Sequence, residues 1–192
     1  MSTATIKLPR LHAGQIKVKR EAKRYNVLDM GRRWGKTTIG LDIIIHPALK
    51  GFPVAWYAPQ NRTLNEIWER AKVALQPIIT RQQESSHTLE LNTGGKIEMW
   101  SLQDEKTANA SRGRKYKLIA IDEAAHISNL KYAWQMVIRP QLTDLKGDAW
   151  FYSSPAGMNY FKELWDRGQD PLRPSWMSWQ MPSTSNPHLP SG

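Results

Sequence analysis

The sequence predicts an α/β fold with a mainly parallel central sheet, flanking helices and one antiparallel hairpin. Short apolar runs bounded by turn residues recur at 25–30, 53–59, 116–122 and 148–154, and such runs are typical of buried strands. Segments with a helical character separate them. Strands that alternate with helices favour a sheet of parallel core strands covered by helices.

The first half of the chain supplies two strands and two helices. "YNVLDM" (25–30) is expected to be a short buried strand. Helix-compatible residues follow from 36 to about 45, and Pro47 is expected to stop that helix. "PVAWYAP" (53–59) predicts a second strand. From 63 to 75, apolar residues recur at helical spacing, which predicts an amphipathic helix.

The second half adds the hairpin and the remaining core strands. "TLELNTGGKIEMWSL" (88–102) predicts two alternating strands joined by a turn at 92–95. The third and fourth core strands follow, with a helix expected between them at about 130–142. The final stretch, from 171 to 192, is rich in proline and serine and lacks periodicity, so it is expected to be a linker.

Composition restricts the class of protein. The chain has 192 residues and no cysteine, which excludes a disulfide framework and thiolate metal sites. It begins without the apolar segment of a signal peptide, and its apolar runs are too short to span a bilayer. Lysine and arginine exceed acidic residues by 27 to 17, a net charge of +10. This excess suits a nucleic acid partner, the alternative being an ordinary solvated surface.

The stretch "MGRRWGKTT" (30–38) ends like a phosphate-binding loop. Such a loop needs a glycine for close backbone approach, a lysine that reaches the outer phosphates and a hydroxyl for magnesium. Gly35, Lys36 and Thr37 supply these groups between a predicted strand and a predicted helix. The alternative is a surface helix that merely begins here with Thr37 as its cap.

The front half of this loop departs from the usual pattern. Met30 stands where the first glycine belongs, and Gly31 follows one position later. Arg32 and Arg33 lie inside the loop, and an arginine there can bind phosphate with two parallel hydrogen bonds. The residues alone do not decide between the two arginines.

A pair of acidic residues follows the third core strand. In "KLIAIDEAA", Asp122 and Glu123 come directly after an apolar run, which places them at the carboxyl edge of the sheet, where ligands of such sheets bind. Asp122 is expected to hold magnesium and Glu123 to polarise the attacking water as general base. The alternative is a strand end that meets solvent. His126 has no second histidine or cysteine at metal-ligand spacing.

Taken together, "GRRWGKTT", "LIAIDEAA" and "SSPAG" resemble the ATPase domain of the large terminase subunit, the DNA-packaging motor of tailed bacteriophages. The resemblance implies a P-loop NTPase fold of the additional-strand catalytic-glutamate type, with ATP and Mg²⁺ as cofactors. It implies an ATPase domain at 1–170 and a linker at 171–192 toward a C-terminal nuclease domain that the chain lacks. Nuclease activity is therefore not expected.

The resemblance also implies roles for single residues. Gln15, in "LHAGQ", matches a glutamine that reads the adenine edge. Lys36 matches the catalytic lysine, while Thr37 and Asp122 match the magnesium ligands. The loop residues that it assigns to nucleotide binding are Gly31, Arg32, Arg33, Trp34, Gly35, Lys36, Thr37 and Thr38.

Further motifs match parts of the family that link the site to other molecules. Ser153 and Ser154 match the coupling motif that senses the γ-phosphate. "WYAPQ" (56–60) matches a motif that helps couple the site to DNA. Arg112 matches an arginine finger that acts on a neighbouring subunit, with Arg114 as its rival.

The implied function is ATP hydrolysis that drives double-stranded DNA into a viral procapsid. The implied partners are double-stranded DNA, a homo-oligomeric ring, the portal and the small terminase subunit, without a membrane. The expected location is the cytoplasm of the infected bacterial host, at the procapsid portal. Two alternatives stay open: a helicase-like nucleic-acid-dependent ATPase, and a basic DNA-binding module with a degenerate nucleotide site.

Overall fold

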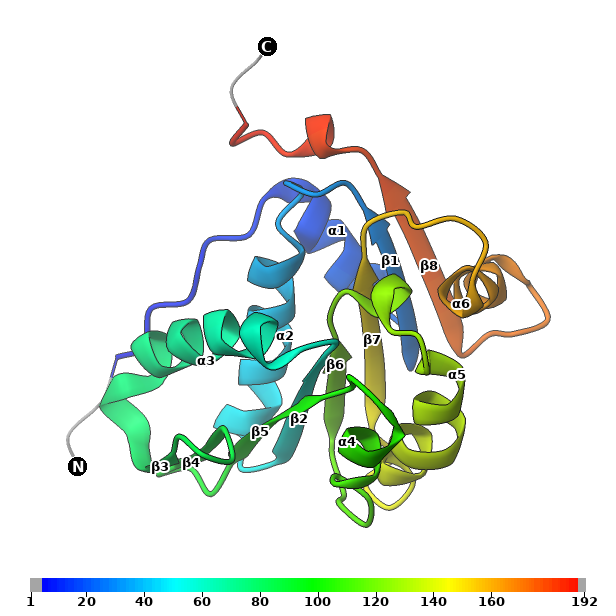
Figure 1. The fold of residues 1–192 in the computed structure, drawn as a ribbon. Helices are drawn as coiled ribbons and strands as arrows, with labels where there is room; N and C mark the ends of the chain where they lie inside the picture. The colour runs from blue at the N-terminus through cyan, green and yellow to red at the C-terminus, as the bar shows by residue number, and fades with distance from the viewer. Residues whose placement is uncertain (1–4, 190–192) are drawn as a thin grey trace.

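The computed structural model describes residues 5–189, which form one eight-stranded sheet in the order β3-β4-β5-β2-β6-β7-β1-β8 (Figure 1). The strands are β1 (Tyr25–Met30), β2 (Pro53–Ala58), β3 (Ile79–Gln83), β4 (Thr88–Leu91), β5 (Lys96–Ser101), β6 (Leu118–Ile121), β7 (Asp148–Ser153) and β8 (Trp176–Met181). From β5 to β8 in this order, every neighbouring pair is parallel. The pairs β3–β4 and β4–β5 are antiparallel.

The helices cover both faces of this sheet (Figure 1). They are α1 (Ala13–Glu21), α2 (Lys36–Leu49), α3 (Asn61–Leu75), η1 (Gln76–Ile78), α4 (Glu105–Asn109), η2 (Ala124–His126), α5 (Leu130–Tyr132), η3 (Ala133–Ile138), η4 (Arg139–Leu142), α6 (Tyr160–Gln169) and η5 (Ser183–Ser185). One core cluster joins α1, α2 and α3 to the first face. A second joins α4, α5, η3, η4 and α6 to the other. The predicted α/β class is confirmed.

The four predicted core strands and the hairpin at 88–102 are confirmed. Two predicted helices differ in detail. α2 continues through Pro47 to Leu49. The expected helix at 130–142 is a composite of an α-helical turn, a π-helical segment and a 3₁₀ turn. Pro140 lies at the start of that last turn, where a missing N–H is tolerated.

The linker expected at 171–192 is wrong for the part that forms β8. β8 pairs in parallel with β1 along its whole length, from Tyr25 opposite Trp176 to Met30 opposite Met181. Its sequence, WMSWQM, alternates, and Trp179 is buried in the first core cluster. This short alternation lies between prolines, and for that reason the strand was not predicted.

Strand order defines the type of sheet. β7 lies between β1, which precedes the phosphate loop, and β6, which precedes the acidic pair. This inserted strand is the additional strand predicted from the resemblance. Because β1, β6 and β7 are parallel, their carboxyl ends meet at one edge of the sheet.

Candidate nucleotide site

The phosphate loop (residues 30–38) joins β1 to α2. Gly35 is the residue before α2 and has φ 97°, a left-handed conformation that glycine adopts without strain. Thr37 lies inside the first turn and does not cap the helix, so the alternative of a Thr37-capped surface helix is wrong. The free backbone N–H groups of this helix start form an anion-binding position.

Lys36 lies at the centre of the site and is 6% exposed. Its Nζ donates hydrogen bonds to the carbonyl oxygens of Met30 and Gly31 at 3.1 and 3.3 Å and to Ser154 Oγ at 3.1 Å. Burial lowers the pKa of Lys36, while the carboxylates of Glu123 and Asp122 oppose the shift. The lysine therefore connects the loop after β1 with the end of β7 and lies in the field of the acidic pair.

The acidic pair lies at the end of β6, at this same edge. Asp122 is 5% exposed, and its Oδ1 accepts a hydrogen bond from the Glu123 N–H at 3.0 Å. Burial raises the pKa of Asp122 to about 7, and the charge of Glu123 adds to the shift. Glu123 has φ 46°, a strained conformation for a non-glycine residue that is common at functional sites.

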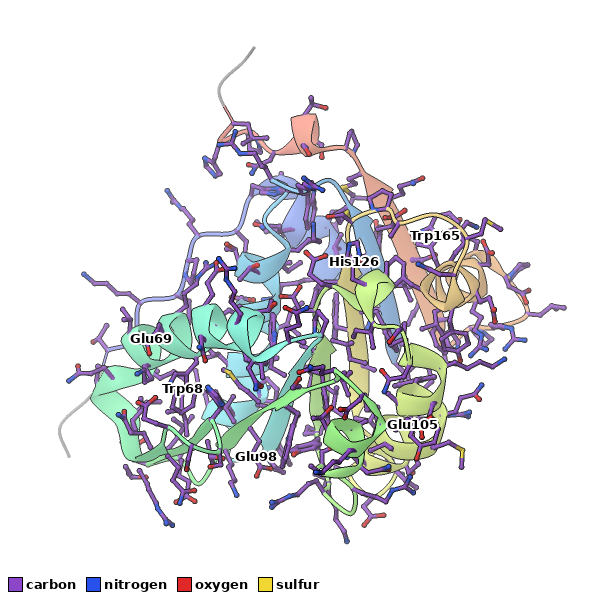
Figure 2. All side chains as sticks on the ribbon, viewed as in Figure 1. Trp68, Glu69, Glu98, Glu105, His126 and Trp165 are labelled. Carbon is purple, nitrogen blue, oxygen red and sulfur yellow. The ribbon has the colours of Figure 1, made fainter. Side chains whose placement is uncertain are left out.

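The side chain of Glu123 reaches solvent, with 32% of it exposed. His126 Nε2 lies 3.6 Å from Glu123 Oε2. Figure 2 labels His126 on the short turn after β6, at the nucleotide edge of the sheet. His126 had no predicted role, because no second histidine or cysteine lies at metal-ligand spacing. The three-residue turn η2 brings its ring back to the Glu123 carboxylate.

Ser153 and Ser154, at and just after the end of β7, connect the two halves of the site. Ser154 Oγ accepts from Lys36, and Ser153 Oγ accepts from the backbone N–H of Ala125 at 3.1 Å. Both serines are buried. Through these two hydrogen bonds the serines contact both the phosphate-loop lysine and the turn that follows Glu123.

Gly31 is required by a contact with the end of the chain. A Cβ at Gly31 would lie 2.3 Å from Ser183 Oγ and 2.4 Å from its backbone nitrogen. The Gly31 N–H donates to the Met181 carbonyl at 3.0 Å, and Asn186 Nδ2 donates to the Arg33 carbonyl at 2.8 Å. The shifted glycine therefore makes room for the segment after β8.

The other loop residues divide into exposed and buried groups. Arg32 and Arg33 are exposed, so both guanidinium groups are accessible to an anion. The ring of Trp34 is fully buried and packs edge-on against His12 at 5.0 Å. Trp34 can offer a ligand only its backbone. The Thr38 hydroxyl accepts a hydrogen bond from Arg70 at 3.3 Å.

Gln15 is buried, with 2% of it exposed. Its Nε2 donates to the Gly35 carbonyl at 3.0 Å, and its Oε1 accepts from the His12 N–H at 2.9 Å. It therefore connects α1 to the phosphate loop. A contact with adenine stays a prediction. These two hydrogen bonds leave a second N–H on Nε2 and a second lone pair on Oε1.

The two candidate finger arginines have different partners. Arg112 is exposed, and its guanidinium donates to Asn109 Oδ1 at 2.7 and 3.0 Å. Arg114 lies 3.5 Å from a carboxylate oxygen of the buried Glu98 and near the Trp100 ring. Among residues 5–189, the Arg112 guanidinium thus has only neutral hydrogen-bond partners, whereas Arg114 is paired with Glu98.

A buried polar cluster that sequence reasoning missed holds the segment before Arg112. Tyr57 OH donates at 2.8 Å to Ser111 Oγ or Gln141 Oε1. Gln141 Nε2 donates to the Ser111 carbonyl at 2.8 Å. These residues come from β2, the loop after α4 and η4. Because these residues lie far apart in the sequence, no local pattern predicts that they meet.

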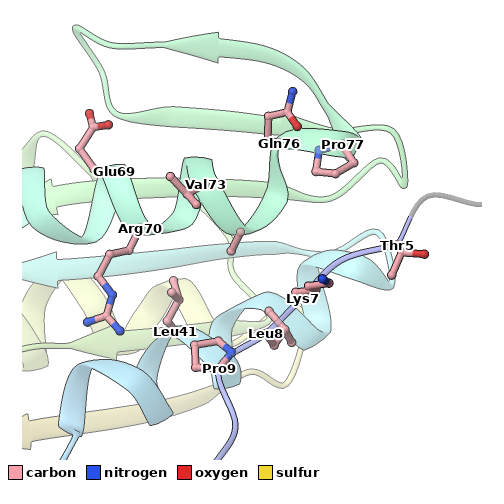
Figure 3. A pocket seen from close by; sticks show the side chains of 11 residues that line it. Thr5, Lys7, Leu8, Pro9, Leu41, Glu69, Arg70, Val73, Gln76 and Pro77 are labelled. Carbon is pink, nitrogen blue, oxygen red and sulfur yellow. The ribbon is translucent and has the colours of Figure 1, made fainter.

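A cavity of about 770 Å³ lies outside this constellation, between the N-terminal segment and α3 (Figure 3). Its lining includes Leu8, Leu41 and Val73, with Arg70 at one end. Among residues 5–189, no helix is both long and apolar enough to cross a membrane.

A phosphate loop and an acidic pair on either side of an inserted parallel strand define a P-loop NTPase domain. Residues 27–175 match the family model described as terminase large subunit, T4likevirus-type, N-terminal. The chain therefore belongs to the large terminase subunit family, as the motifs predict.

Individual relatives agree with this family. The large terminase subunit of Escherichia phage T5 is 28% identical over 171 residues, which cover 85% of this chain and 38% of that protein. The chain thus spans well under half of that relative. The ATPase domain of the Thermus phage P74-26 large terminase superposes with a TM-score of 0.72 at 20% identity, over 89% of this chain and 80% of that one.

A large terminase from a thermophilic bacteriophage, solved in complex with ADP, superposes with a TM-score of 0.73 at 14% identity. The match covers 94% of this chain and 48% of that one. At such identities these two structures support the fold, and the P-loop NTPase prediction is confirmed at that level.

Proposed function

We propose that this domain hydrolyses ATP and that hydrolysis drives double-stranded DNA into a viral procapsid. The observation that carries the proposal is the convergence of Lys36, Ser154 and the Asp122–Glu123 pair at one sheet edge. The electrostatic coupling of Lys36 with both carboxylates supports a single triphosphate site between them. The ADP complex of the thermophilic phage terminase supports nucleotide as the ligand.

The residues divide the chemical work. Lys36 and Arg32 or Arg33 would bind the outer phosphates, and Thr37 and Asp122 would hold Mg²⁺, which neutralises phosphate charge. A buried carboxylate whose pKa is raised suits this role, since a nearby dication favours its ionised form. Glu123 would accept the proton of the attacking water. Arg112 of a neighbouring copy would stabilise the transition-state charge.

Gln15 would contact adenine, with the backbone of Gly31, Trp34 and Gly35 and the hydroxyl of Thr38 completing the loop. Ser153 and Ser154 would pass the loss of the γ-phosphate to the rest of the domain. These assignments combine the family resemblance with the contacts of each side chain.

Packaging also requires partners that lie outside this chain. We infer a homo-oligomeric ring around double-stranded DNA at the portal, with the small terminase subunit, in the cytoplasm of the infected host. The net charge of +10 supports a grip on DNA phosphates that weakens steeply with salt.

The test is Lys36→Ala. ATP affinity and hydrolysis should both collapse, because the ammonium that neutralises the outer phosphates is lost. Lys131→Ala, an exposed lysine on α5, is the matched control and should leave both unchanged. If Lys36→Ala matches the parent because neither protein binds or hydrolyses ATP, the alternative of a DNA-binding module with a degenerate nucleotide site is correct. Strand displacement by the chain would instead favour the helicase-like alternative.

A further inference from the structure

A second cavity, of about 480 Å³, lies at the amino ends of the parallel strands, on the edge opposite the nucleotide site. Its walls come from the ends of α1 and α2 and from the segments that lead into β2, β6 and β7. The lining residues are Lys19, Ala22, Lys23, Ile43, His46, Pro47, Lys50, Phe52, Lys117, Leu118, Asp148 and Trp150. We call it the amino-edge cavity.

The floor of the amino-edge cavity is apolar. Ile43, Leu118 and Trp150 belong to the first core cluster, and Phe52 stands at the edge with 37% of its surface exposed. Among residues 5–189, Phe52 is one of few large apolar side chains that reach solvent to this extent. Covering an apolar floor of this kind with an apolar group is favourable, because both surfaces are removed from water.

The rim of the amino-edge cavity is basic. Four lysines and one histidine line it, against the single carboxylate of Asp148. Lys19 and His46 share Asp42 as a partner. Within the described part of the chain, no ion pair includes Lys23 or Lys50, and both are exposed. Their positive charge is therefore available to a ligand.

Lys117 completes this arrangement above the floor. Its Nζ donates to the Leu145 carbonyl at 3.2 Å and lies 5.9 Å from the centroid of the Phe52 ring. Burial raises the pKa of Asp148, while Lys117 and Arg24 oppose the shift. The one carboxylate in the lining is thus partly offset by the positive charges of Lys117 and Arg24 in its own chain.

We propose that the amino-edge cavity docks an acidic protein segment that inserts one aromatic or large aliphatic side chain. Charge complementarity places the acidic groups on Lys23 and Lys50, and the apolar floor receives the inserted side chain. A DNA duplex fits less well, because its outer surface presents phosphates and sugars and offers no apolar group that could reach a recessed floor.

The position of the cavity gives this docking a defined consequence. An occupant of this cavity lies at the sheet edge opposite Lys36 and Glu123, so the nucleotide site stays free. A partner held here would stay attached whether or not nucleotide is bound. The proposal does not depend on the proposed ATPase activity.

The probe is a short fluorescein-labelled peptide with one phenylalanine flanked by glutamates, and binding is followed by fluorescence anisotropy. The double variant Lys23→Glu/Lys50→Glu should weaken binding about tenfold or more, because attraction becomes repulsion. Phe52→Ser should weaken it several-fold, because part of the apolar contact is lost. The double variant Lys106→Glu/Lys131→Glu, at exposed positions on α4 and α5, is the charge-matched control. Both this control and Lys36→Ala should bind the peptide like the parent.

Two results would overturn the docking proposal. One is equal affinity for a peptide in which glycine replaces the phenylalanine, since the floor would then contribute nothing. The other is displacement of the peptide by a DNA duplex at lower concentration than by unlabelled peptide, which would assign the cavity to nucleic acid. Circular dichroism spectra of the variants identify any loss of binding that comes from unfolding.

Discussion

The two edges of the sheet carry charge in opposite ways. At the carboxyl edge, Lys36 and Asp122 are buried, their pKa values are shifted by burial, and Glu123 is held in a strained backbone conformation. At the amino edge, Lys23 and Lys50 are exposed around an apolar floor. Burying a charged group lowers stability, and proteins keep such groups mainly where chemistry requires them. The buried charges at the carboxyl edge suit the proposed chemistry, and the exposed charges around the apolar floor suit the proposed docking.

The largest expected effect comes from Arg112, which would complete the nucleotide site at the carboxyl edge of a neighbouring copy. Arg112→Ala should reduce turnover at high protein concentration by about 10³–10⁵-fold, because a fixed cation on the transition state is lost. Steady-state phosphate release measures this. Mixing the Arg112→Ala protein with the Glu123→Gln protein should restore part of the activity. In one type of mixed interface, an intact Arg112 from one copy meets an intact Glu123 from the other. Absence of restoration would exclude action between copies, and Lys50→Ala should have no effect.

Glu123→Gln should reduce turnover by about 10²–10⁴-fold while ATP affinity stays close to that of the parent. The substitution keeps the shape of the side chain and removes its capacity to accept a proton. Single-turnover hydrolysis and equilibrium binding of a labelled ATP analogue measure the two quantities separately. Glu105→Gln, on the exposed first turn of α4, is the control. Unchanged turnover in Glu123→Gln would reject this residue as the general base.

Much of the carboxyl edge is predictable because its signals are local. Asp122 and Glu123 follow an apolar run, and Lys36 follows a glycine between a strand and a helix. Parallel strands then bring these groups to one edge without any further information. The apolar runs likewise identified the core strands, whereas β8 was missed because its alternation is short and lies between prolines.

The rest of the site depends on contacts between distant parts of the chain. Gly31 owes its identity to Ser183, which no local pattern reveals. Trp34 was assigned to the nucleotide, yet its ring fills the core against His12. The amino-edge cavity also escaped prediction, because its lysines lie on separate elements and resemble a solvated surface when read in order.

Asp122→Asn should stabilise the nucleotide-free domain by about 1–3 kcal/mol at pH 8. The folded-state pKa of Asp122 is raised to about 7 from 3.8, so the folded protein binds more protons than the unfolded one between these values. Stability therefore falls as pH rises from about 4 to about 7 and stays low above that. The asparagine carries no charge and removes this loss.

Thermal unfolding at pH 8 and pH 5 measures the effect of Asp122→Asn, and the difference from the parent should shrink at pH 5. Asp148→Asn is the matched variant at the amino edge. Burial raises the pKa of Asp148 as well, but Lys117 and Arg24 oppose the shift, so the gain should be smaller. Equal gains at both edges would contradict the view that the carboxyl edge retains the costlier charge.

The smallest expected effect separates the two candidate finger arginines through the tyrosines that support them. Tyr57 OH belongs to the cluster that holds Ser111, next to Arg112. Tyr116 OH donates to Glu98 at 2.8 Å, and Glu98 pairs with Arg114. Each Tyr→Phe change should cost about 1–2 kcal/mol of stability, because it leaves a buried acceptor without its donor.

Only the tyrosine behind the true finger should also affect turnover. Tyr57→Phe should lower turnover several-fold at high protein concentration and leave ATP affinity unchanged, since a loosened Ser111 misplaces the next residue, Arg112. Tyr116→Phe should keep the parental turnover at a similar loss of stability. The reverse pattern would assign the finger to Arg114, and equal losses of turnover would mean that stability alone links these buried hydroxyls to activity.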